Sequence, residues 1–306
     1  MNLCANNQTY LYGLEDEFFE FVKLYDNKKL PNKILLSGQK GIGKCTLAYH
    51  LINFILSQNE DFSYNLKNLT INQENKSFRL IKNGSNPNFN LIDVKTEKKK
   101  IDIDQIRNLI NNLNKSSLNS KPRFILIDNI EYLNLNSINA LLKILEEPNE
   151  NTYFILINNN KKITPTILSR CLNFKITLSN KKILTISNEL LNDNINNLIN
   201  KDLLNYYFTP GKIYNLVKFS KEKEINLSDI NLNSFLSLLI NKAYYKEDDK
   251  IKIMVYDFVE SFLLKKISII YSDLFSYFLK RINDTKNFNL DEESLFIEIN
   301  SKLLNG

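Results

Sequence analysis

The sequence predicts an α/β fold in which a parallel-sheet domain over residues 1–178 is followed by helices to the end of the chain. Between residues 34 and 177, short and continuous apolar runs alternate with segments of helical periodicity. Such runs are typical of strands that are buried on both faces of a parallel sheet. After about residue 178 the strand pattern stops, and apolar residues recur only at helical spacing.

The first apolar run leads into a glycine-rich loop. Residues 34–36 are followed by Gly38, Gly41 and Gly43, and then by Lys44 and a helical pattern. These are the parts of a phosphate-binding loop, in which backbone N–H groups and a helix N-terminus converge on phosphate oxygens. Lys44 is expected to reach the phosphates of a nucleotide. A strand-to-helix turn without a ligand is the alternative.

The residue after the lysine departs from the usual pattern. Cys45 stands where a hydroxyl group normally binds Mg²⁺, and Thr46 comes one residue late. A thiol is a soft ligand, whereas Mg²⁺ prefers hard oxygen ligands. ATP with Mg²⁺ is therefore the expected cofactor, but the thiol should weaken metal binding. Thr46 and Asp128 are the candidate metal ligands.

Asp128 ends the apolar run 123–127, and a carboxylate at the end of such a strand holds Mg²⁺ through water in related hydrolases. A glutamate usually follows and deprotonates the attacking water. Here the next residue is Asn129, whose amide cannot accept that proton. We interpret Glu131, two residues further on, as a solvated residue at a helix start.

The apolar run 152–157 ends in three asparagines, of which Asn158 is the first. A polar side chain at this point can sense a γ-phosphate or hold the lytic water, and a plain turn explains the same residues equally well. A strand is also expected at 91–94. Helices are expected within 8–30, at 102–113 and at 136–147, the last of them stopped by Pro148.

Composition excludes several classes of protein. The net charge of +6, from 40 basic and 34 acidic residues, is compatible with work near nucleic acid but is not evidence for it. The three cysteines form no CxxC pair, so neither a disulfide framework nor a zinc site is expected. The first residues given are polar and lack the apolar core of a signal peptide, and no run approaches roughly 20 apolar residues. We therefore expect a cytoplasmic protein without a membrane partner.

Four stretches together resemble the clamp-loader branch of the AAA+ family, and within it the delta-prime subunits of bacterial DNA polymerase III. They are residues 30–38, 41–44, 139–148 and 165–171. The resemblance implies a P-loop AAA+ domain over 1–178, a helical lid over 179–220 and an all-α collar, which serves oligomerisation, over 221–306. It also implies partners, namely motor subunits of gamma/tau type and a delta subunit, with the sliding clamp and primer-template DNA reached through the complex.

The same resemblance assigns roles to individual residues. Ser169-Arg170-Cys171 would carry an arginine finger, with Arg170 reaching the ATP of a neighbouring subunit. An always-charged guanidinium stabilises charge on phosphoryl oxygens. A structural arginine at a strand–helix joint is the alternative. Pro210-Gly211-Lys212 resembles the sensor 2 turn of the family, which makes Lys212 a further candidate.

Departures from the family pattern indicate which type of clamp-loader subunit this chain resembles. The zinc module of motor subunits is absent, because no cysteine lies between Cys45 and Cys171. Cys45 stands in place of the hydroxyl residue that binds Mg²⁺, and Asn129 in place of the glutamate that deprotonates water. The motif Ser169-Arg170-Cys171, in contrast, is intact. This pattern favours a subunit that donates an arginine and hydrolyses little or no ATP itself. The alternatives are a competent motor ATPase that uses Thr46 in place of Cys45, and a nucleotide-free scaffold adaptor. No paired carboxylates of a polymerase palm are present.

Overall fold

The computed structural model describes residues 4–95, 100–114, 119–204, 208–265, 272–288 and 290–304. The chain divides into two compact units: the first is Met1–Ile186 with Thr209–Gly211, and the second is Ser187–Phe208 with Lys212–Gly306. None of the helices in the described ranges is long and apolar enough to cross a membrane. The division of the helical part into a lid and a collar at residue 220 stays a prediction.

The first unit is built on one sheet of five parallel strands in the order β2-β3-β4-β1-β5. Their bounds are β1 Lys33–Ser37, β2 Phe89–Ile92, β3 Arg123–Ile127, β4 Thr152–Asn158 and β5 Leu172–Lys175. The three middle strands are buried along most of their length, which explains their unbroken apolar runs. Ser37 lies beside Asn158 in register, so the loops that follow these strands gather at one edge of the sheet. The predicted α/β fold is confirmed.

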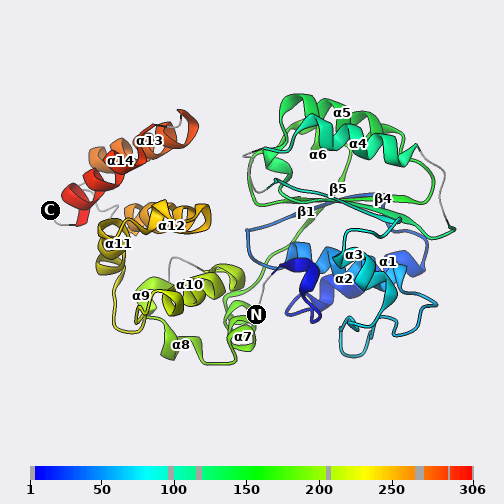
Figure 1. Ribbon diagram of the computed structural model, residues 1–306, viewed down its shortest axis with the longest axis horizontal. Helices are drawn as coiled ribbons and strands as arrows, with labels where there is room; N and C mark the ends of the chain where they lie inside the picture. The colour runs from blue at the N-terminus through cyan, green and yellow to red at the C-terminus, as the bar shows by residue number, and fades with distance from the viewer. Residues whose placement is uncertain are drawn as a thin grey trace. The chain divides into compact units, whose positions relative to one another are not determined.

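Helices cover both faces of this sheet (Figure 1). One face carries α1 Glu15–Asp26, α2 Lys44–Leu56 and α3 Lys76–Lys82, and the other carries α4 Ile103–Leu113, α5 Leu135–Glu146 and α6 Pro165–Leu168. Alternate residues of each strand feed the two cores: Leu36 packs with the first group of helices and Leu35 with the second.

Local signals in the sequence set the helix boundaries. At the start of α5, Asn134 Oδ1 accepts a hydrogen bond of 2.8 Å from the Ser137 N–H. Asp102 and Gln105 form a capping box at the start of α4. Pro165 begins α6, where its missing N–H is not needed. The predicted helices at 102–113 and 136–147 are therefore confirmed as α4 and α5 to within one residue at each end.

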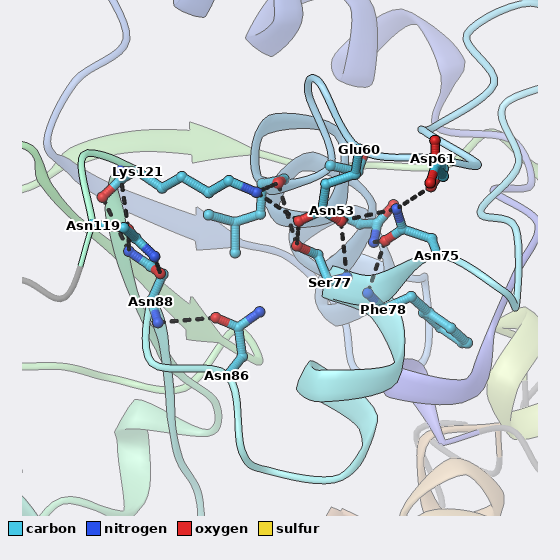
Figure 2. Close-up of polar contacts among 12 residues, drawn as sticks. Asn53, Glu60, Asp61, Asn75, Ser77, Phe78, Asn86, Asn88, Asn119 and Lys121 are labelled. Atoms are coloured by element: carbon cyan, nitrogen blue, oxygen red, sulfur yellow. Dashed lines mark hydrogen bonds and ion pairs between the residues drawn. The ribbon is translucent and has the colours of Figure 1, made fainter.

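Figure 2 shows a polar network that organises the long segment between α2 and β2. Glu60 accepts hydrogen bonds from the Ser77 N–H (3.0 Å) and hydroxyl (2.8 Å), and it forms an ion pair of 2.6 Å with Lys121. Asn88 and Asn119 exchange two amide hydrogen bonds of 2.9 Å. These bonds give the segment a defined conformation.

The second unit contains no strand among its described residues. The remaining helices of the chain are α7 Asn180–Leu191, α8 Ile195–Leu198, α9 Lys201–Leu204, α10 Pro210–Glu222, α11 Leu232–Asn241, α12 Asp249–Lys265, α13 Ser272–Phe288 and α14 Glu292–Ile299. Short turns lie at Ala5–Asn7, Ile130–Tyr132, Tyr244–Lys246 and Asn300–Leu304. Aromatic pairs mark the core of this unit: the ring centroids of Phe235 and Phe258 lie 5.3 Å apart, and those of Tyr245 and Phe296 lie 4.5 Å apart. An all-helical C-terminal part was predicted.

Candidate functional site

The predicted phosphate-binding loop joins β1 to α2. A Cβ atom at Gly38 would lie 2.4 Å from the Ile176 carbonyl oxygen, so only glycine fits there. Gly41 and Gly43 have φ angles of 87° and 98°, which residues with side chains rarely adopt. Gly43 is also the N-cap of α2, so the first N–H groups of that helix follow the loop directly. The backbone therefore has the form that a phosphate-binding loop needs.

Lys44 is folded into this loop, and the residue is only 3% exposed. Its ammonium group donates to the carbonyl oxygens of Gly38 (2.9 Å) and Gln39 (2.7 Å) and to Asn159 Oδ1 (3.0 Å). Burial lowers the pKa of Lys44 to about 8, although the nearby carboxylate of Asp128 opposes the shift. The charge is thus held mainly by neutral acceptors.

Asn159 extends this contact into a chain of side-chain hydrogen bonds. Its amide nitrogen donates to Asn129 Oδ1 (2.8 Å) and to Glu131 Oε1 (2.9 Å), and the Asn129 amide donates in turn to Asp93 Oδ1 (2.8 Å). The interpretation of Glu131 as a solvated residue is wrong: it lies in the short helical turn Ile130–Tyr132, but it is partly buried and bonded to Asn159. Lys44 and Glu131 consequently share one polar network.

Asn158, the predicted sensor residue, is turned away from Lys44. Its amide nitrogen donates to the Lys161 carbonyl (3.0 Å), and its oxygen accepts from the Lys161 N–H (3.2 Å). Asn159, one residue later, is the one that touches Lys44. The three consecutive asparagines were visible in the sequence, but which of them faces the lysine depends on how the chain turns after β4. A sensor role for Asn158 stays a prediction.

Cys45 and Asp128 form the other half of the site. The Cys45 thiol donates a hydrogen bond to the Asp128 carboxylate, and burial together with that carboxylate raises the pKa of the thiol. Burial and the charge of Asp93 raise the pKa of Asp128 to about 6. Sulfur is a soft ligand, so Cys45 suits Mg²⁺ less well than the hydroxyl group that usually stands at this position. In the described ranges, no group of three or more His, Cys, Asp or Glu residues could hold a metal ion. Thr46, partly buried on the same helix, stays the other predicted ligand.

The segment Thr209–Gly211 lies against the phosphate-binding loop within the first unit. The Gly211 N–H donates to the Gly41 carbonyl oxygen (2.9 Å), and a Cβ atom at Gly211 would lie 3.0 Å from the Gly41 Cα atom. Lys212, the predicted sensor 2 residue, belongs to the second unit, where its ammonium group lies 2.8 Å from the Asp257 carboxylate. This ion pair joins residues 45 positions apart and was not predicted, and a sensor 2 role for Lys212 stays a prediction.

Arg170 lies at the surface of the first unit, just after α6. Its guanidinium donates to Glu146 Oε1 (2.6 Å) through Nη2 and to the Thr166 carbonyl oxygen (3.0 Å) through Nη1. The arginine side chain is 31% exposed and that of Glu146 is 55% exposed. The Ser169 hydroxyl donates to the same Thr166 carbonyl (3.1 Å) and lies 3.5 Å from Nη1. This guanidinium is therefore held near solvent and not in the core of its own unit.

Comparison with known proteins places these features in a context. Residues 15–180 match the family described as DNA polymerase III, delta subunit. DNA polymerase III subunit delta' of Buchnera aphidicola subsp. Schizaphis graminum is 26% identical over 278 residues, which cover 87% of this chain and 83% of that protein. DNA polymerase III subunit gamma of the same organism is 34% identical over 171 residues, covering 55% of this chain and 45% of that protein. The structure of a DNA polymerase III gamma subunit-related protein from Thermotoga maritima covers 92% of this chain and 97% of its own, with a TM-score of 0.54; at 17% identity this likeness concerns the fold alone.

Proposed function

The chain belongs to the DNA polymerase III delta-subunit family, and on this premise we propose that it is a delta-prime-type subunit of a clamp loader. In this role it stands in a ring beside a motor subunit of gamma/tau type, with a delta subunit in the same complex. Arg170 completes the ATP site of the motor neighbour. The complex loads the sliding clamp onto primer-template DNA in the cytoplasm, and this chain contributes little hydrolysis of its own.

The observation that supports this role most is the surface position of the Arg170 guanidinium. A planar group that is always charged can stabilise the charge that develops on phosphoryl oxygens. At the chain's own phosphate loop, Asn129 cannot act as a base and Cys45 offers a thiol in place of a hydroxyl. The chain therefore keeps the arginine that acts on a neighbouring subunit, and it lacks two groups needed for hydrolysis at its own phosphate loop.

Reconstitution tests the proposal. The chain is assembled with motor and delta subunits, the clamp and primed DNA, either as wild type or as Arg170→Ala. ATP turnover at the site that Arg170 completes should fall by about 10³ to 10⁵. Assembly, followed by size-exclusion chromatography, should be unchanged. Arg170→Lys is the matched control: it keeps the charge but loses the planar fork, so its turnover should stay low. A fully active Arg170→Ala complex would favour the scaffold adaptor.

One contact favours a second function, that of a motor ATPase. Glu131 shares a hydrogen-bond network with Lys44 through Asn159, so a carboxylate does lie near the phosphate loop. It could serve as the base that Asn129 cannot be, with Thr46 in place of Cys45 at the metal. ATP turnover by the isolated chain separates the two functions. Appreciable hydrolysis that both Lys44→Ala and Glu131→Gln abolish would establish the motor, and its absence supports the delta-prime role.

A further inference from the structure

The contact between Glu146 and Arg170 joins two elements that are distant in the chain. Glu146 is the last residue of α5, and Arg170 follows the single turn of α6. The distance of 2.6 Å between Glu146 Oε1 and Arg170 Nη2 is that of a short, charge-assisted hydrogen bond. Nothing in the resemblance, the motifs or the family match assigns a role to this carboxylate.

The backbone segments that carry Glu146 and Arg170 are anchored by neighbouring residues in the hydrophobic core. Leu145, next to Glu146, has no exposed surface, and Ile167 of α6 is 1% exposed in the same core. Ile167 anchors the one-turn helix α6 in that core, and the partly buried Cys171 packs against the same core. Both Cα positions are therefore set by the core, and only the two long side chains retain freedom.

We propose that Glu146 is a positioning residue that holds the Arg170 guanidinium in the orientation in which it meets the nucleotide of the neighbouring subunit. This inference rests on the proposed function. A free arginine side chain samples many rotamers, and each one that does not reach the phosphate reduces the occupancy of the productive geometry. The carboxylate removes part of that freedom before the two subunits meet.

The hydrogen bonds around Arg170 leave N–H donors for a phosphate. A guanidinium has five N–H donors, and the bonds to Glu146, Thr166 and the Ser169 hydroxyl use at most three of them. The remaining donors can reach phosphoryl oxygens while the carboxylate keeps its hold. Because both side chains are partly exposed, the pair contributes little to folding, so a role in orientation explains it better than a role in stability.

Steady-state kinetics of the reconstituted complex test this role through Glu146→Gln, which keeps the shape of the side chain and removes its charge. The kcat for clamp-dependent ATP hydrolysis should fall about tenfold, while KM for ATP stays the same, because the guanidinium is present but misaligned. Glu147→Gln is the matched control: the same change one residue along, at an exposed carboxylate, should leave kcat at the wild-type value.

A double variant identifies the path of the effect. In the Arg170→Ala background, Glu146→Gln should cause no further loss, because the group that it positions is gone. If Arg170→Ala lowers kcat but Glu146→Gln does not, or raises it, the positioning role is overturned and the proposed function stands. A loss that persists in the Arg170→Ala background also overturns it. If Arg170→Ala itself has no effect, the proposed function fails first.

Discussion

Two charged side chains of the first unit are held in opposite ways. Lys44 is 3% exposed and is enclosed by loop carbonyl oxygens and Asn159. Arg170 lies near solvent and is held by the exposed Glu146 carboxylate, the Thr166 carbonyl oxygen and the Ser169 hydroxyl. We call the first region the phosphate-loop site (Lys44, Cys45, Asp128, Asn129 and Asn159) and the second the Arg170 surface (Glu146, Thr166, Ser169 and Arg170).

The difference concerns how easily each cation can change partners. A ligand at the phosphate-loop site must compete with several hydrogen bonds in a desolvated network, where each lost partner leaves a buried polar group unsatisfied. A ligand at the Arg170 surface replaces water and, at most, an exposed ion pair. This difference is compatible with the proposal that Arg170 meets the nucleotide of a neighbouring subunit.

The largest expected effect on stability lies beneath the Arg170 surface. Ile167→Ala should lower the free energy of unfolding by about 2–5 kcal/mol, because it leaves a cavity under α6. Urea unfolding followed by circular dichroism measures it, since the chain has no tryptophan. Leu168→Ala, at a neighbouring side chain that is 43% exposed, is the control and should stay within about 0.5 kcal/mol of wild type. Equal losses would show that α6 is not anchored as described.

A pH effect should come from the helix that follows the phosphate loop. His50 of α2 is the only histidine of the chain, and burial lowers its pKa to about 4. The unfolded chain takes up this proton near its ordinary pKa of 6.5, so the fold should lose up to about 3 kcal/mol of stability as pH falls from 6.5 to 4. Urea unfolding across this range measures the loss.

His50→Gln is the matched variant for that experiment. Glutamine can still accept from the Tyr64 hydroxyl and donate to the Gln8 carbonyl, the two groups bonded to His50, but it does not titrate. The difference in unfolding free energy between wild type and His50→Gln should therefore change with pH over this window. A difference that is constant from pH 7 to 4 would contradict a buried, neutral His50.

A smaller effect contrasts the partly buried ion pair between Glu60 and Lys121 with the more exposed pair at Arg170. The side chain of Glu60 is only 13% exposed and bonds to Lys121 and Ser77, so Glu60→Gln should lower the unfolding free energy by about 1–3 kcal/mol. A double-mutant cycle with Lys121→Met measures the coupling. The exposed pair Glu74–Arg79 is the control, where Glu74→Gln should change stability by less than about 0.5 kcal/mol.

The smallest effect is expected for Glu146→Gln in the isolated chain. Because both partners are partly exposed, the loss of unfolding free energy should be less than about 1 kcal/mol. Together with a clear loss of kcat in the complex, this result would separate orientation from stability. A loss as large as that of Glu60→Gln would mean that the pair serves mainly to hold α5 and α6 together.

The sequence predicted those parts of the molecule that depend on local pattern. The strand–loop–helix order around Lys44 was readable because glycine, apolar runs and helix caps act over a few residues. The departures at Cys45 and Asn129 were equally visible, since they occur inside a fixed motif spacing.

The missed features depend on tertiary placement. Lys121 meets Glu60 from a position 61 residues away, and Arg170 meets Glu146 from 24 residues away. No local rule pairs such residues, because the fold alone decides which side chains face each other. The choice of Asn159 over Asn158 as the partner of Lys44 has the same origin, in the direction of one turn.

The central claim is that Arg170 acts on the triphosphate of a neighbouring subunit, and a structure of the assembled clamp loader with a non-hydrolysable ATP analogue tests it most directly. We expect an Arg170 Nη atom within about 3 Å of a γ-phosphate oxygen on the adjacent motor subunit, at hydrogen-bond distance. An Arg170 side chain that points into its own unit, far from any neighbouring nucleotide, would contradict the account.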